Sequence, residues 1–227
     1  MAGVILELKN LGHRYITHWA LANVSLSSTA KEVIAILGPN GCGKSTLLKI
    51  LATRLDPTCG EGTILGLDLK QNNLEIRTEV EWLGHELGFY KALTAEENLK
   101  FSMSLCGKKA DRETISEVLT KMGIVKARNK AVGLFSTGMK KRLALARILL
   151  RRPNAILLDE PHANLDRDGK QLMNACIIHW KKQGIPVFLA SHDHSEVLPL
   201  CDKTLVLNHG TVAYFGDPQT IPPDVIL

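Results

Sequence analysis

Residues 38–46 of the chain read Gly38-Pro39-Asn40-Gly41-Cys42-Gly43-Lys44-Ser45-Thr46. This run matches the pattern G-x-x-x-x-G-K-[ST] at every fixed position. Glycines let backbone N–H groups curve around phosphate oxygens, and a helix that begins there adds its N-terminal amides and the positive end of its dipole. Lys44 would reach the outer phosphates of a nucleotide, and the Ser45 hydroxyl would ligate magnesium. The run therefore predicts a site for a nucleoside triphosphate with Mg²⁺.

The sequence on either side of this run fits the same interpretation. Before it, Val33–Leu37 is entirely apolar, which is typical of a strand covered on both faces in the middle of a sheet. After it, we expect a helix over about residues 45–54, ended by Asp56-Pro57-Thr58. The alternative is a glycine-rich turn that arose by chance, and the flanking strand and helix argue against it. We interpret Cys42 as a spacer whose backbone matters, and not as a nucleophile.

Strand-like and helix-like segments alternate along the rest of the chain, which predicts an α/β fold with a mostly parallel core sheet and an antiparallel β part. Helical patterns dominate between about residues 86 and 152, so we expect a helical subdomain inserted into the α/β core of a single domain over residues 1–227. The expected strands are 4–8, 22–26, 33–37, 62–65, 80–83, 155–158, 186–190, 205–207 and 212–215. The expected helices are 45–54, 95–105, 112–122, 139–151 and 166–182.

The composition excludes several classes of protein. The 227 residues are 45% hydrophobic and 22% charged, which is enough apolar material for a large core and excludes disorder as the general state. The apolar runs are short compared with the roughly 20 residues of a membrane-spanning helix, and the first residues lack a signal-peptide pattern. The five cysteines form no CxxC pair, which favours a reducing cytosol. The net charge of +5 is spread along the chain and gives no reason to expect nucleic acid.

A pair of carboxylates follows another buried strand. The apolar run Ala155-Ile156-Leu157-Leu158 ends in Asp159-Glu160. The carboxyl end of a strand beside a phosphate-binding loop is where a magnesium-organising group belongs, so we expect Asp159 to hold the metal, through water. Glu160, one residue further, would polarise an attacking water as a general base. A solvated acidic loop is the alternative, and the apolar strand before the pair argues against it.

Four further features follow one another in a recognisable order: Tyr15 before the run 20–26, Phe135-Ser136-Thr137-Gly138-Met139 before a basic helix, Ala163-Asn164-Leu165-Asp166, and Ser191-His192-Asp193. With these features the chain resembles an ATP-binding-cassette (ABC) ATPase, a P-loop NTPase, over nearly its whole length. The resemblance implies that Tyr15 stacks on adenine. It further implies that residues 135–139 are the signature motif, residues 163–166 the D-loop and His192 the switch histidine.

The chain departs from the pattern of this family at several positions. His85 stands where the family usually has the glutamine of the Q-loop, and its imidazole would meet a metal-bound water and add pH sensitivity near neutrality. In the signature motif, usually LSGGQ, Thr137 adds a Cβ and a hydroxyl close to the expected γ-phosphate. His162 replaces a more usual threonine or serine, and we assign it no role.

The resemblance implies that one chain carries half of each active site. The phosphate loop, Asp159, Glu160 and His192 would act from one subunit, while Ser136, Thr137 and Gly138 would close over the γ-phosphate from a second cassette, with Asp166 at the interface. ATP would join two cassettes, in a homodimer, and hydrolysis would release them. The partners implied are this second cassette and integral-membrane permease subunits, with the chain peripheral on the cytoplasmic side of the inner membrane.

The cargo is suggested by one stretch only. Residues 83–99, with Leu83-Gly84-His85 and Leu93-Thr94-Ala95-Glu96-Glu97-Asn98-Leu99, resemble the ATP-binding subunit of the bacterial haem exporter used in cytochrome c maturation. The alternatives are an ABC-2-type exporter of another cargo and an ABC ATPase without a transport role. A P-loop kinase or GTPase would give no reason for Ser136-Thr137-Gly138 before a basic helix.

Overall fold

The computed structural model describes residues 4–29 and 31–225, and in it the chain forms two compact units. Unit 1 holds the described residues up to Gly84, then Asn154–Pro161 and the described residues from Ile177 onward. Unit 2 holds His85–Pro153 and also His162–Cys176. No helix in the described part of the chain is both long enough and apolar enough to cross a membrane.

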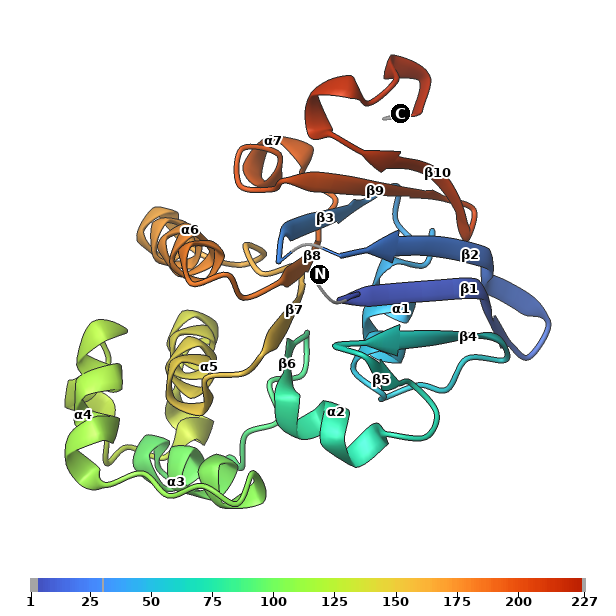
Figure 1. Cartoon of the computed structure of the whole chain (residues 1–227). Helices are drawn as coiled ribbons and strands as arrows, with labels where there is room; N and C mark the ends of the chain where they lie inside the picture. Colours follow the sequence, from blue (N-terminus) through green and yellow to red (C-terminus); the bar gives the residue numbers. More distant parts are fainter. Residues whose placement is uncertain (1–3, 30, 226–227) are drawn as a thin grey trace. The chain divides into compact units, whose positions relative to one another are not determined.

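The core of unit 1 is a six-stranded sheet in the order β10-β9-β3-β8-β7-β6 (Figure 1). All its neighbouring strands are parallel except β9 and β10, which form an antiparallel hairpin. Every residue of β3, β7 and β8 is buried, as expected for strands covered on both faces. The α/β class with a mostly parallel sheet is therefore confirmed. The strands are β3 (Val33–Leu37), β6 (Val80–Leu83), β7 (Ala155–Asp159), β8 (Val187–Ala190), β9 (Lys203–Asn208) and β10 (Thr211–Gly216).

A second, antiparallel sheet of unit 1 has the order β2-β1-β4-β5, with β1 (Leu6–Tyr15), β2 (His18–Ser28), β4 (Cys59–Ile64) and β5 (Leu67–Asp68). The first two strands are much longer than the sequence predicts. The register between them shifts after Leu8 and again after Leu11, and Asn10 has φ 50°. These irregularities break the alternation of apolar and polar residues, and so hide the second half of β1 from a pattern of period two.

The helices of unit 1 are α1 (Lys44–Leu51), α2 (Asn73–Glu79) and α7 (His194–Val197), and α6 (Arg167–Lys182) belongs to it from Ile177 onward. Helix α1 packs against β7, β8 and β2 (Figure 1), and its buried leucines and Ile50 join one apolar core with both sheets. Helix α2 was not predicted from the sequence. Because only Ile76 of its seven residues is buried, it carries no apolar periodicity.

Unit 2 is helical, with α3 (Ala95–Leu105), α4 (Arg112–Lys121) and α5 (Thr137–Arg151) packed against one another (Figure 1). Two short 3₁₀ helices connect α4 to α5, Val125–Ala127 and Val132–Leu134. Two more follow β10 in unit 1, Pro218–Thr220 and Pro223–Val225. The sequence predicts an insertion over about residues 86–152 only. The structure adds residues 162–176 to unit 2, where the Lys141 ammonium donates to the Ala163 carbonyl and the His162 Nε2 lies 2.6 Å from the Asn174 Oδ1.

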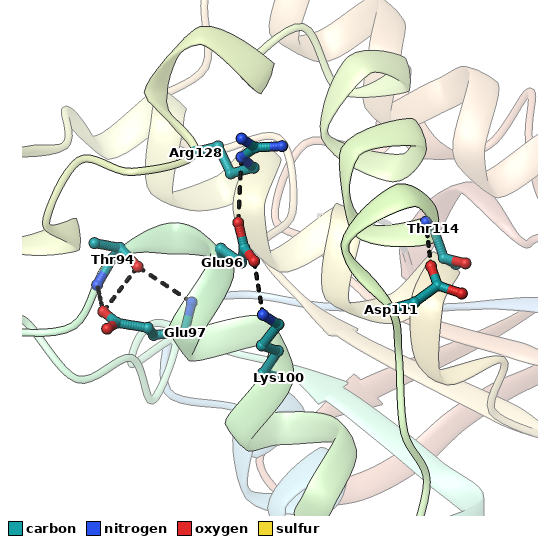
Figure 2. Close-up of polar contacts among 7 residues, drawn as sticks. All are labelled: Thr94, Glu96, Glu97, Lys100, Asp111, Thr114 and Arg128. Carbon is teal, nitrogen blue, oxygen red and sulfur yellow. Dashed lines mark hydrogen bonds and ion pairs between the residues drawn. The ribbon is translucent and has the colours of Figure 1, made fainter.

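Side chains cap the first two helices of unit 2 (Figure 2). Thr94 and Glu97 form a reciprocal capping box at α3, in which the Glu97 amide donates to the Thr94 hydroxyl oxygen at 3.2 Å and the Thr94 amide to the Glu97 carboxylate at 2.8 Å. Asp111 caps α4 by accepting from the Thr114 amide at 2.8 Å. The hydrogen bond from Lys100 lowers the pKa of Glu96, which also pairs with Arg128.

Candidate functional site

Three loops of unit 1 meet at one edge of the six-stranded sheet. Strands β3 and β7 both lie beside β8 and run parallel to it, with Ile36 and Asp159 each opposite Ala190. The carboxyl ends of these strands therefore coincide, and the segments that follow them emerge side by side. These segments are the glycine-rich loop, the Asp159-Glu160 pair and the Ser191-His192 loop, which the sequence predicts to act together.

The glycine-rich loop leaves β3 and turns directly into α1. Gly38 has φ 139°, and a Cβ there would lie 2.1 Å from the Leu207 carbonyl oxygen. Gly43 has φ 106°, and a Cβ there would lie 2.4 Å from the Ala20 carbonyl oxygen. Only glycine fits either position, because both the backbone angle and the space exclude a side chain. The loop is therefore held closely by β9 on one side and β2 on the other.

The ammonium group of Lys44 lies over this loop. It is 2.7 Å from the carbonyl oxygen of Gly38 and 3.1 Å from that of Pro39, and the residue is 6% exposed. Asn40 and Gly41 lie at the exposed tip of the loop, and Thr46 is buried on α1. A buried ammonium needs several polar partners, and here the partners are neutral carbonyls. The positive charge is thus available to an anion that enters the loop.

Ser45 and Asp159 are in direct contact at the base of the loop. The Ser45 hydroxyl donates to Asp159 Oδ1 at 2.8 Å, and Asp159 is 3% exposed. Hydroxyl and carboxylate oxygens are the ligands that Mg²⁺ takes in phosphate-transfer sites, where one or two protein oxygens act together with substrate phosphates and water. The residues present therefore fit a magnesium ion. The sequence predicts a magnesium role for each of these residues, and the structure brings them into contact although they are 114 positions apart.

Glu160 and His192 are in polar contact beside this pair. The Nδ1 of His192 is 2.9 Å from Oε1 of Glu160, with 58% of the histidine side chain and 15% of the glutamate side chain exposed. Glu160 has φ 50°, a left-handed conformation that is costly for a non-glycine residue. Its amide donates to the Ala190 carbonyl at 2.9 Å, which ties the strained residue to β8. The carboxylate is thus held at a defined place over the edge of the sheet.

Cys42 points into the apolar core instead of the loop interior. Burial raises the pKa of the Cys42 thiol, although the neighbouring Lys44 ammonium acts in the opposite direction. A thiol kept neutral is a poor nucleophile, which agrees with the interpretation of Cys42 as a spacer.

Tyr15 is the last residue of β1, and 43% of it is exposed. Its ring is in edge-to-face contact with His13, with the ring centroids 4.5 Å apart and the planes at 75°. Nothing in the sequence pattern singled out His13. The register of β1 shifts on both sides of His13, so no pattern of period two could have pointed to it.

The remaining predicted site residues belong to unit 2. Ser136 caps α5, accepting from the Met139 amide at 3.2 Å, and both Ser136 and Thr137 are exposed. A Cβ added to Gly138 would meet no atom of the described chain within 4 Å. Asp166 accepts from the Gly169 amide at 2.8 Å at the start of α6. His85 is exposed in the loop after β6. The structure places these five residues in a unit separate from the phosphate loop.

The fold of unit 1 and its glycine-rich loop define a P-loop nucleoside triphosphatase. Within this class, one family is identified: the protein-family model described as "ABC transporter" matches residues 21–163 of the chain. The chain belongs to the ABC transporter family, which makes it an ATP-hydrolysing subunit of such a transporter.

Individual proteins agree with this assignment. The chain is 34% identical over 205 residues to the ABC transporter ATP-binding protein NatA of Bacillus subtilis (strain 168), covering 89% of this chain and 83% of NatA. It is 31% identical over 222 residues to the spermidine/putrescine import ATP-binding protein PotA of Lawsonia intracellularis (strain PHE/MN1-00), covering 96% of this chain and 60% of PotA. A dimeric structure of the cassette MJ0796 with ADP and Pi has a TM-score of 0.86 at 25% identity and covers 95% of this chain and 100% of MJ0796.

Proposed function

We propose that residues 1–227 form a single cassette, with the helical part inserted in the α/β core, that binds ATP with Mg²⁺ at the loop edge of unit 1 and powers a membrane permease. The observation that carries this proposal is the convergence of two contacts at that edge, Ser45 with Asp159 and Glu160 with His192. Both join residues from different loops, and both have the chemistry that phosphate transfer requires.

The phosphate loop binds the triphosphate. Backbone amides of residues 38–46 face the phosphate oxygens at the start of α1, where the helix dipole favours negative charge. Lys44 exchanges its contacts with Gly38 and Pro39 for the outer phosphates. Support for this role comes from the position of its ammonium group over the loop.

Ser45 and Asp159 hold the magnesium ion, which when bound neutralises charge on the phosphates. Glu160 accepts a proton from the attacking water as general base. His192 positions this carboxylate through its Nδ1 and reaches toward the terminal phosphate. The short contact between Glu160 and His192 and the backbone restraint on Glu160 support a preorganised base.

A second cassette completes the site. Ser136, Thr137 and Gly138 of the facing copy close over the γ-phosphate, and Asp166 lies at the interface between the copies. The open space at Gly138 supports this role, because a Cβ there would meet no atom of the described residues within 4 Å, its own helical turn and its two neighbours aside. The dimeric state of the similar cassette MJ0796 also supports it.

The cassette works with permease subunits and is peripheral on the cytoplasmic side of the inner membrane. Membership of a transporter family supports the permease partner. The exposed loop that begins at His85 transmits the change between the dimeric and the released state, and the imidazole of His85 would take the place of the family's glutamine toward the metal.

Haem export is one candidate for the cargo, and it rests on residues 83–99. Much of that stretch has a local structural role. Thr94 and Glu97 form the capping box of α3, and Asn98 and Leu99 are buried. Within residues 83–99, the evidence for haem as the cargo thus comes from Leu83-Gly84-His85. An ABC-2-type exporter of another cargo is the second candidate. The name of PotA, a spermidine/putrescine import protein, favours a cargo other than haem but does not favour export.

The test of the proposed chemistry is the variant Glu160→Gln. We expect it to bind ATP normally, to hydrolyse ATP at least about a hundredfold more slowly, and to accumulate as an ATP-bound dimer in gel filtration. The matched control is Glu196→Gln, which changes another carboxylate of the His192 segment. Hydrolysis by Glu160→Gln at the rate of the unchanged protein would contradict the general-base role.

The cargo is tested separately by purifying the protein from membranes and identifying what accompanies it. Recovery with a permease of cytochrome c maturation supports haem export. Recovery with another multi-span permease supports the second candidate. Recovery with ribosomes and no permease would overturn a role in transport.

A further inference from the structure

We infer that His13 is a positioning residue for Tyr15, and that it holds the ring on which the adenine of ATP stacks. The inference rests on the proposed function, because it assumes that Tyr15 contacts the base. Two contacts of His13 within unit 1 carry it: one with the Tyr15 ring and one with the segment that follows α1.

The first contact is between the two rings. Their centroids are 4.5 Å apart and their planes meet at 75°, which is the edge-to-face geometry that aromatic pairs prefer. His13 is 8% exposed, whereas Tyr15 is 43% exposed. The histidine is therefore the covered partner, and the tyrosine is the one that a ligand can reach.

The second contact anchors His13 from another direction. Its Nδ1 lies 2.9 Å from the carbonyl oxygen of Asp56 and donates to it in the tautomer that carries the proton on this nitrogen. Asp56 follows α1, whose first residue is Lys44. His13 thus connects the strand that carries Tyr15 to the segment that follows α1, the helix that begins at the phosphate loop.

Tyr15 needs such a restraint because of its place in the fold. It is the last residue of β1, and Ile16 after it has φ 49°, which is unusual for a β-branched residue, and is 93% exposed. An aromatic side chain at the end of a strand loses rotational freedom when a base stacks on it, and this loss weakens binding. A ring already held by His13 has lost much of that freedom before the nucleotide arrives.

The experiment compares a ligand that has a base with one that has only phosphates. Dissociation constants for Mg²⁺-ADP and Mg²⁺-pyrophosphate are measured by calorimetry on the full chain. His13→Asn keeps a donor toward Asp56 and removes the ring, and His13→Phe keeps a ring and removes the donor. Thr58→Val is the matched control. It deletes the 3.0 Å bond from the Arg14 amide to the Thr58 hydroxyl, which joins the same two segments without involving the tyrosine ring.

We expect His13→Asn to weaken ADP binding by about two- to tenfold and to leave pyrophosphate binding unchanged. Thr58→Val should keep the tighter binding of ADP relative to pyrophosphate. His13→Phe, which keeps a ring but loses the contact with Asp56, should weaken ADP binding less than His13→Asn does. In steady-state assays, His13→Asn should raise the KM for ATP and leave kcat unchanged.

Tyr15→Ala separates this inference from the function on which it rests. If Tyr15→Ala binds ADP in preference to pyrophosphate as strongly as the unchanged protein does, Tyr15 does not contact adenine. The inference about His13 then fails as well. If Tyr15→Ala abolishes the preference and His13→Asn does not reduce it, only the positioning role is overturned. An equal loss in Thr58→Val, a larger loss in His13→Phe than in His13→Asn, or a parallel loss of pyrophosphate binding also overturns the positioning role.

Discussion

Replacing Asn98 by alanine should loosen the start of α3. Asn98 is 3% exposed, and its side chain ties the helix to the loop before it. Its Nδ2 donates to the carbonyl oxygens of Tyr90, Leu93 and Thr94 at 3.0, 3.1 and 2.9 Å, and its Oδ1 accepts from the Tyr90 amide at 2.8 Å. The loop has no regular structure of its own, so these contacts determine its path.

The magnitude follows from this geometry. The two hydrogens on Nδ2 are shared among three carbonyls, so the side chain makes the equivalent of three full hydrogen bonds, each with a net value of about 1 kcal/mol. Alanine is a better helix former than asparagine by about 0.6 kcal/mol, which offsets part of the loss. We expect a destabilisation of about 2.5 kcal/mol, or a roughly 60-fold larger constant for local opening.

Hydrogen exchange with peptide-level mass spectrometry measures this opening directly. Amides within residues 90–99 should exchange faster by about that factor, while peptides from β3 in unit 1 should be unchanged. Ser102→Ala on the same helix is the control and should stay within about 0.5 kcal/mol of the unchanged protein. Exchange in residues 90–99 at the unchanged rate in Asn98→Ala would refute the reasoning.

Three further outcomes are expected. Glu97→Ala should lower the urea concentration at the midpoint of unfolding of unit 2, since it removes one half of the capping box with Thr94; no shift of the midpoint would contradict this. Lys44→Ala should weaken ATP binding about ten- to a hundredfold in calorimetry, whereas Lys49→Ala on the same helix should not. Burial raises the pKa of Cys176 to about 11, so the folded thiol keeps its proton at a pH where the unfolded thiol has lost it. Stability should therefore fall as the pH rises from about 9 to 11, and Cys176→Ala should flatten this part of the profile.

The elements that the sequence predicts well are those with a strong local pattern. Val33–Leu37 and Ala155–Asp159 are apolar throughout, and their residues are all buried. Asp111 and Ser136 stand at the starts of helices that the sequence predicts, where their side chains accept backbone hydrogen bonds. Helix α2 and the second half of β1 were not predicted from the sequence. Helix α2 buries only one residue, and β1 contains shifts in register.

The stretch used to suggest a cargo shows how a family likeness can have a local cause. Thr94 and Glu97 are the two partners of the capping box at the start of α3. Asn98 is the residue that holds the preceding loop, and Leu99 is fully buried. Residues with such roles are required by the packing of unit 2, whatever a transporter carries.

The sequence by itself determined the class of this protein, because the phosphate loop is a contiguous run whose chemistry depends on residue types at fixed spacing. It also pointed to Asp159, Glu160 and His192 through the strands that precede them. Only the tertiary structure decided which of these groups touch, since Ser45 meets Asp159 across 114 residues and His13 is anchored to Asp56 across 43. The physical reason is that hydrogen bonds and ring contacts act over a few ångströms, and which residues come that close depends on the order and register of the strands in each sheet.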